Sequence, residues 1–256
     1  MTASPSDNES KPDLTGIPSV FDIVFYSVTL TKRHASDIYG FIGYLLFPLI
    51  LYFGIQGIPG ILGDVAITAV NILFIVISCW AAAAISTLIS LKAGKAHEKK
   101  QHDPRSISAH ATSILGKLLF AVLLSALIQS AGYILLVVPG ILATILLTFT
   151  FEEVVLRGHG PLSALAASKT RVQHQIFAIG WRLFSIAAAF IVVYATLSTA
   201  VFIVGAWITN IPVATLVTST TPLWIDAVLT VVQLALIPPV IVAHTVLYLA
   251  SSPEKE

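Results

Sequence analysis

Five residues between positions 157 and 171 have the types and spacing of a site for a lipid phosphate, namely Arg157, His159, Gly160, Lys169 and Arg171. The glycine turn at 158–160 is followed by Pro161, which suits the first position of a helix. The start of a helix presents free N–H groups and a partial positive charge, which favour an anion. These residues therefore predict a contact with an anionic headgroup. In the alternative interpretation, their charges only set the orientation of the chain in a membrane.

A second set lies in the last apolar stretch and comprises Gln233, Pro238, Pro239 and His244. Proline removes a backbone donor and clashes with the preceding turn, so the pair should kink or break a helix. Carbonyls freed inside a bilayer need partners or a wet cavity, and transporters use such interrupted helices for substrate sites. An ionisable residue in a span is also a functional candidate. The set predicts either a transport path or a structural kink with His244 near the membrane interface, where its cost is small.

Two acidic residues, Glu152 and Glu153, suggest a paired acid–base or cation site. Neighbouring residues on a helix point about 100° apart, so the two carboxylates do not easily share one proton or one metal ion. The alternative is that one faces water at the cytosolic surface while the other pairs with Arg157 or Arg182.

No metal site and no cofactor are expected. Three histidines share a polar loop with two acids, but the spacing fits no zinc pattern and two lysines lie among them: His97, Glu98, Lys99, Lys100, His102, Asp103 and His110. A solvated loop is the preferred interpretation. Cys79 is the only cysteine, so no disulfide within the chain is possible.

Motifs of known enzyme classes are not found in the sequence. There is no Gly-x-Ser-x-Gly, no His-Glu-x-x-His and no phosphate-binding glycine loop followed by Lys-Ser/Thr. The apolar stretches also lack the acidic pair that an intramembrane hydrolase would need. The basic residues are too sparse for a nucleic-acid surface. The sequence therefore predicts a protein that is not an enzyme and does not bind nucleic acid.

The elements that must position these residues are membrane spans. Of the 256 residues 56% are apolar and 11% charged, whereas roughly a quarter of an ordinary soluble domain is charged. Six apolar stretches stand out, and most reach the roughly 20 residues that cross a bilayer. They cover residues 39–57, 65–91, 114–138, 141–151, 176–207 and 223–249. We expect an all-α integral membrane protein with six transmembrane helices, in which the short fourth helix continues to Glu152 and Glu153 at the cytosolic surface.

The 14 Lys and Arg residues fix the expected orientation. They lie before the first span, around the connections between spans two and three and between spans four and five, and after the last span. The other three connections contain none. Positively charged loops stay in the cytosol, so both termini should be cytosolic.

Two shorter helices complete the expected fold. Around residues 19–30, Phe21, Val24, Phe25 and Val28 share one helical face with Ser27 elsewhere, which predicts an interfacial helix on the cytosolic surface. A short amphipathic helix should follow Pro161, between spans four and five. We divide the chain into a disordered cytosolic tail (1–18), one six-span domain (19–251) and a cytosolic tail (252–256).

Two segments resemble a bacterial family. Residues 132–143 (GYILLVVPGILA) and 153–168 (EVVLRGHGPLSALAAS) are similar to the YciC-like group of six-span proteins, also called the glycerophosphodiester phosphodiesterase membrane domain. The shared pattern is a "PGI" hairpin, a glycine turn and an "AL..S" helix, and it covers residues 128–180. The chain differs in having Arg157 where an acid is common and Lys169 where an aromatic is common. The resemblance implies a bacterial inner-membrane protein, without the separate phosphodiesterase domain.

Together these observations predict a multi-pass protein of the bacterial cytoplasmic (inner) membrane with an accessory or structural role. Its expected partners are the anionic lipids of the inner leaflet and, beyond them, other membrane proteins. The second hypothesis is a small solute or ion permease that uses the sixth span. An intramembrane enzyme is a distant third.

Overall fold

A computed structural model describes residues 19–55, 60–92, 104–218 and 221–251, and the regular elements in these ranges are all α-helices. The two tails (1–18 and 252–256) and most of the polar loop with the histidines lie outside the described residues. The helices are α1 (Val20–Arg33), α2 (Ala35–Gly43), α3 (Leu46–Ile55), α4 (Ile61–Lys92), α5 (Pro104–Leu135), α6 (Val137–Leu146), α7 (Thr150–Arg157), α8 (Pro161–Val172), α9 (Ile176–Thr209), α10 (Val213–Thr218) and α11 (Leu223–Ala250).

Six stretches of helix are long and apolar enough to cross a membrane, which confirms the predicted fold class. They are Ala35–Ile55, Ile61–Lys92, Pro104–Leu135, Val137–Arg157, Ile176–Thr209 and Leu223–Ala250. The first combines α2 with α3, and the fourth combines α6 with α7. The helices α1 and α8 are the two predicted short helices outside the spans.

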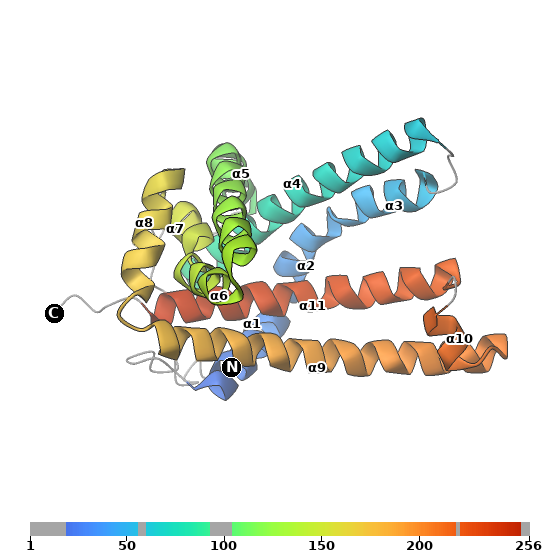
Figure 1. The fold of residues 1–256 in the computed structure, drawn as a ribbon. Helices are drawn as coiled ribbons and strands as arrows, with labels where there is room; N and C mark the ends of the chain where they lie inside the picture. Colours follow the sequence, from blue (N-terminus) through green and yellow to red (C-terminus); the bar gives the residue numbers. More distant parts are fainter. Residues whose placement is uncertain (1–18, 56–59, 93–103, 219–220, 252–256) are drawn as a thin grey trace, which may run out of the picture.

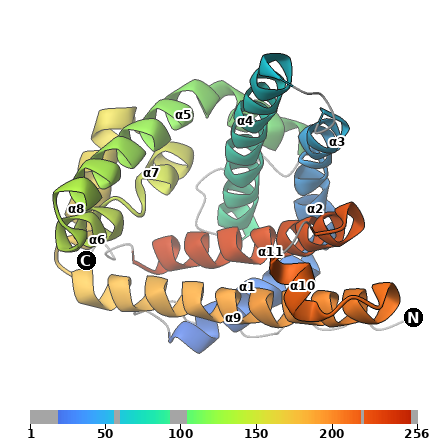
Figure 2. The ribbon, with the colours of Figure 1, turned by 45° about the vertical axis from the view of Figure 1, so that its right-hand side comes forward.

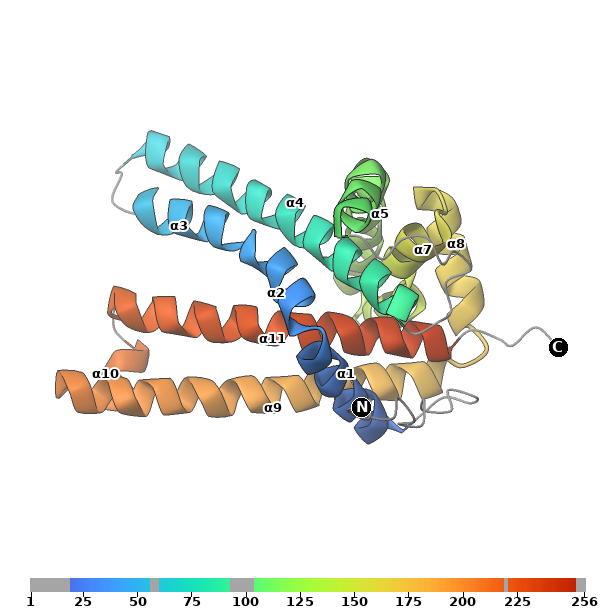
Figure 3. The ribbon, with the colours of Figure 1, turned by 180° about the vertical axis from the view of Figure 1, so that it is seen from behind.

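The long helices are arranged in pairs. α9 and α11 pack along each other, and α3 packs on α4 (Figure 1). α5 packs on α4 and α6, and it diverges from the other long helices. It is seen nearly end-on in Figure 1 and lengthwise after the turn to Figure 2, where it leads down to α6. α1 lies across α11 and α9 (Figure 3).

The buried core lies at one end of the molecule, which we call the basic end because it holds Lys92, Arg157 and Lys169. Ala81, Ala83 and Ala84 of α4 are fully buried there, because small side chains let neighbouring helices approach closely. Toward the other end, α9 exposes a nearly continuous apolar surface. Such a surface suits lipid chains, which need no polar partner.

α1 is amphipathic in a different way from the prediction. Ile23, Ser27 and Leu30 are buried against the bundle, so Ser27 belongs to the packed face. Phe21 and Phe25 point outward, 77% and 65% exposed, with their rings stacked at 6.2 Å. The helix therefore keeps an aromatic face free for a membrane interface while its opposite face packs on the protein.

The fourth span continues past Glu152 and Glu153 as predicted, but it is not one continuous helix, and the predicted position of the two glutamates at a surface was wrong. α6 ends at Leu146, a turn follows, and α7 begins at Thr150. Glu152 and Glu153 are 2% and 1% exposed instead of lying at a cytosolic surface. The turn redirects α7 into the basic end, where α8 and α11 supply partners for both carboxylates.

Candidate functional site

A buried charged site lies where α7, α8 and α11 meet at the basic end. α7 delivers two carboxylates to it and then ends at Gly158, whose φ of +70° is left-handed and suits glycine. Gly160 precedes α8, and Pro161 occupies its first turn, as the sequence predicted. The tight turn folds α8 back onto α7, so residues 18 apart in the sequence come into contact.

Glu153 is the centre of the first half of the site. Its Oε1 accepts hydrogen bonds from Arg171 Nε at 2.9 Å and from the Tyr248 hydroxyl at 3.2 Å. Arg171 also donates to the Tyr248 hydroxyl at 3.3 Å, and its guanidinium lies 4.3 Å from the centre of the Tyr248 ring. A planar cation thus lies against an aromatic face and a carboxylate at once, which is the arrangement that suits arginine in a buried site.

The second oxygen of Glu153 faces the turn. His159 Nδ1 lies 3.1 Å from Oε2, at an ion-pair distance but without the alignment of a hydrogen bond. Arg157 Nε lies 3.9 Å from the same oxygen, and its side chain is 50% exposed. Arg157 and His159 thus form a half-exposed rim beside the buried pair of Glu153 and Arg171. Their contribution to stability is much smaller than that of Arg171, because water screens exposed charges.

Glu152 forms the second half of the site with α11. Its Oε1 lies 2.5 Å from His244 Nδ1, and His244 Nε2 lies 3.0 Å from the hydroxyl of Thr148. The other oxygen, Oε2, is buried and has no hydrogen-bond partner among the residues that the structure describes. As expected for adjacent helical positions, the two carboxylates take different partners. The expectation that one of them faces water was wrong.

Phe149 and Ser168 hold the two halves together. The Phe149 ring packs edge-on against Tyr248 at 5.4 Å and tilted against His244 at 5.6 Å. The Ser168 hydroxyl of α8 accepts from the Phe149 backbone N–H at 3.1 Å and donates to the Leu146 carbonyl at 2.8 Å. One buried side chain therefore satisfies two backbone groups at the break between α6 and α7.

Sequence reasoning missed Thr148, Phe149 and Tyr248 as parts of the site. A signal existed for Tyr248, because it follows His244 by four residues and so shares its helix face. No sequence pattern marked the other two.

The predicted lipid-phosphate residues surround the α7–α8 turn but do not meet at one point. Gly160 is at the start of α8, and Lys169 lies nine residues further on, about 13 Å along a helix. Lys169 is exposed, whereas Arg171 turns inward to Glu153 and is only 6% exposed. Arg157, His159 and Lys169 therefore remain as the accessible members of the predicted lipid contact.

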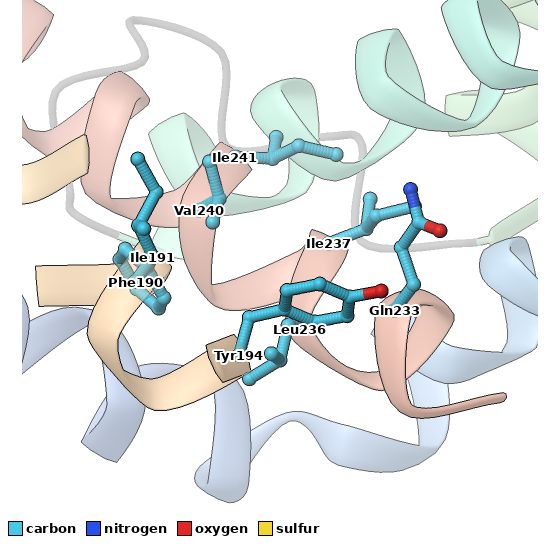
Figure 4. Close-up of a pocket in the computed structure, with 8 residues that line it drawn as sticks. All are labelled: Phe190, Ile191, Tyr194, Gln233, Leu236, Ile237, Val240 and Ile241. Carbon is cyan, nitrogen blue, oxygen red and sulfur yellow. The ribbon is translucent and has the colours of Figure 1, made fainter. Parts of the chain in front are cut away.

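The predicted transport-path residues all lie on α11, but Gln233 and His244 face different surroundings. Gln233 lines a groove of about 340 Å³ between α9 and α11 (Figure 4), whereas His244 is in the charged site. The groove is lined by Phe190, Ile191, Tyr194, Gln233, Leu236, Ile237, Val240 and Ile241. Apart from Tyr194 and Gln233 these side chains are hydrocarbon, so the groove suits an apolar chain better than a polar solute.

α11 continues as a helix through Pro238 and Pro239, and both prolines are buried. Pro239 has no N–H to donate to the Ala235 carbonyl four residues earlier. The Tyr39 hydroxyl of α2 donates to that carbonyl at 3.0 Å. A protein group thus replaces the lost backbone bond, which favours the structural interpretation of the proline pair over a wet cavity at this carbonyl.

In the described ranges, no group of three or more His, Cys, Asp or Glu residues is arranged to hold a metal ion. His110 is the described member of the histidine loop, and its Nε2 lies 3.2 Å from the Val155 carbonyl. His97, Glu98, His102 and Asp103 lie outside the described residues. Cys79 is a half-buried residue of α4.

Comparison with known proteins found no matching family model, no matching curated protein and no matching solved structure.

Proposed function

We propose that this chain is a non-enzymatic protein of the bacterial cytoplasmic membrane, with an accessory or structural role and a contact to anionic lipids of the inner leaflet. One observation carries the proposal. The buried charges at the basic end pair with one another across α7, α8 and α11, while Arg157 and Lys169 stay exposed beside them. Such an arrangement stabilises a fixed shape with a basic surface.

The orientation follows from the same distribution of charge. The connections of α3 to α4 and of α9 to α11 carry no Lys or Arg. The helix ends that they join, the C-termini of α3 and α9 and the N-termini of α4 and α11, lie away from the basic end (Figure 1). Because basic segments stay in the cytosol, the basic end and both termini are assigned to the cytosolic side. The resemblance of residues 128–180 to the YciC-like bacterial family supports the same membrane.

The exposed cations at the α7–α8 turn carry the lipid contact. A basic residue at the surface of an anionic leaflet contributes about 1 kcal/mol of attraction, which corresponds to about a fivefold change in binding. The uncapped start of α8 adds two or three free backbone N–H groups beside Arg157. The turn therefore presents both point charges and backbone donors to a phosphate.

We expect the variant Arg157→Gln/Lys169→Gln to retain less anionic phospholipid than the wild type after purification in mild detergent. Loss of both charges should reduce retention of phosphatidylglycerol by more than tenfold at low salt and leave phosphatidylethanolamine unchanged. Native mass spectrometry of the full chain measures the retained amounts of both lipids. Arg171 is left intact because it belongs to the buried site.

The matched control is Lys32→Gln/Lys92→Gln, which removes two exposed charges from the ends of α1 and α4. An equal loss of phosphatidylglycerol in both double variants would show that the cations of the turn act only through general attraction. The site at the turn would then be rejected.

A permease that uses α11 is the second candidate, because Gln233 opens into the α9–α11 groove and His244 is an ionisable group within a span. It ranks second because the groove is nearly all hydrocarbon and its lining residues end at Ile241, before His244. Solute flux in proteoliposomes that Gln233→Leu abolishes would favour this candidate.

A further inference from the structure

We propose that Glu152 and His244 form a binding site for one exchangeable proton, which reaches the buried carboxylate through Thr148. This inference does not rest on the lipid contact proposed above. The site is built around Glu152 Oε2, which has no hydrogen-bond partner among the residues that the structure describes.

Glu152 is buried and only half satisfied. Glu152 is 2% exposed. Its Oε1 is bonded to His244, whereas its Oε2 has no hydrogen-bond partner in the described part of the chain. A buried, unpaired carboxylate oxygen is costly, and a carboxyl group in such a place commonly takes up a proton instead of keeping its charge. The site therefore has room for a proton on Glu152.

His244 provides the connection. Both ring nitrogens are bonded, Nδ1 to Glu152 at 2.5 Å and Nε2 to the Thr148 hydroxyl at 3.0 Å. An imidazole with two partners can accept a proton at one nitrogen and release another from the second. Thr148 lies in the turn between α6 and α7 and is only half buried. The His244 side chain is itself 29% exposed, so the three side chains link two half-buried residues to a buried carboxylate.

The proton transfer balances without a further reactant. In the starting state neutral His244 carries its proton on Nδ1 and donates to ionised Glu152, while Nε2 accepts from Thr148. A proton from water arrives at Nε2 by way of the Thr148 hydroxyl, and the Nδ1 proton moves to Glu152 Oε1. The product is neutral His244 with its proton on Nε2 and a protonated carboxyl on Glu152, so one proton has been bound.

The neighbouring charged groups are engaged elsewhere. Glu153 of α7, Arg171 of α8 and Tyr248 of α11 bond to one another, and His110 of α5 lies against a backbone carbonyl. On the side of α4, the contact to α11 is between uncharged Ser86 and Thr245. The other charged groups on α7, on α11 and on the helices packed against them are Asp22, Lys32 and Arg33 of α1, Asp37 of α2, Asp64 and Lys92 of α4, Arg105 and Lys117 of α5, Arg157 of α7, Lys169 of α8, Arg182 of α9 and Asp226 of α11. Among the described residues, Glu152 is the charged group in contact with His244.

A proton fits this site better than a metal ion. One carboxylate, one imidazole and one hydroxyl surround it, whereas Ca²⁺ and Mg²⁺ need six or more oxygen ligands, including water. The described residues form no cluster of three metal-ligating side chains. The carboxyl group of Glu152 is therefore assigned as a site for a proton and not for a metal ion.

The test is infrared difference spectroscopy of the full chain in vesicles, with glutamate labelled with ¹³C on its carboxyl group. Lowering the pH should produce the shifted carbonyl band of a buried, protonated glutamic acid in the wild type. Glu152→Gln should lose this band, and His244→Asn should change the pH at which it appears. After a rapid drop in pH, Thr148→Val should slow its appearance while leaving its final size unchanged.

Thr144→Val is the matched control, because Thr144 lies one turn earlier and bonds to Gly140 and Tyr133 instead of His244. In Thr144→Val the carbonyl band should appear at the same rate as in the wild type. The proposal is overturned if the wild type shows no pH-dependent band of a buried glutamic acid. This outcome needs no variant, so it can be observed even if Glu152→Gln does not fold. A band that persists in folded Glu152→Gln, or equal rates in both threonine variants, also overturns it. If Na⁺ or Mg²⁺ suppresses the band at constant pH, the site binds a metal cation and the proposal of a proton site is overturned.

Discussion

Arg171→Met should lower the free energy of unfolding by about 3–5 kcal/mol, because it leaves the Glu153 carboxylate buried without its main partner. Both side chains are more than nine-tenths buried, so water cannot take over the role of the guanidinium. Tyr248 would keep its own bond to Glu153 but lose the cation against its ring. Reversible unfolding of the purified protein in mixed micelles, followed by circular dichroism, measures the change.

The control for this prediction is Arg157→Met, which removes a half-exposed cation 3.9 Å from the same carboxylate. Exposed pairs of this kind contribute about 0–1 kcal/mol, so the control should stay close to the wild type. Combining Arg171→Met with Glu153→Gln should restore much of the stability, because no unpaired charge is then buried. Equal effects of the two arginine variants would show that Arg171 does not hold the site together.

Ser168→Ala should cost about 1–3 kcal/mol, although it removes a single oxygen atom. The Phe149 N–H and the Leu146 carbonyl would both lose their partner in a buried place. The same unfolding measurement applies, and hydrogen exchange at the Phe149 amide should become faster. The effect should concentrate at the break between α6 and α7, because α8 is tied to that break through this hydroxyl.

Ser163→Ala is the comparison within the same helix. Ser163 is exposed, and its hydroxyl donates to the Gly160 carbonyl at 2.9 Å, so water replaces this bond at little cost. If both serine variants unfold alike, the Ser168 contact contributes nothing to the fourth span and the proposed cause of its break is wrong.

The spans were predictable because their signal is local. A stretch of about 20 apolar residues is dictated by the thickness of the bilayer and needs no knowledge of its neighbours. The break in the fourth span was not predictable in this way. Residues 146–150 contain no proline or glycine, so no breaker is present. The group that allows the break, the hydroxyl of Ser168, lies about twenty residues further along the chain.

The site could be predicted only in part, for the same reason. His244 and the pair of glutamates were recognised as two separate candidates, since ionisable residues in or near spans are rare. The contact between Glu152 and His244 joins positions 92 residues apart, and it depends on how α7 rotates against α11. Arg171 was assigned to lipid because its charge suggests a surface. Which side of a short helix faces inward is decided by partners that the sequence does not place.

The bond from Tyr39 to the Ala235 carbonyl has a consequence for how such chains can diverge. The hydroxyl is needed because Pro239 cannot supply the N–H that a regular helix would offer at that carbonyl. A lineage that replaces Pro239 with alanine regains the backbone bond and frees position 39 to become phenylalanine. A lineage that loses the hydroxyl first leaves a carbonyl unsatisfied within the bilayer. Tyrosine at 39 and proline at 239 should therefore be inherited as a pair, and where the pair is lost, Pro239 should be replaced before Tyr39.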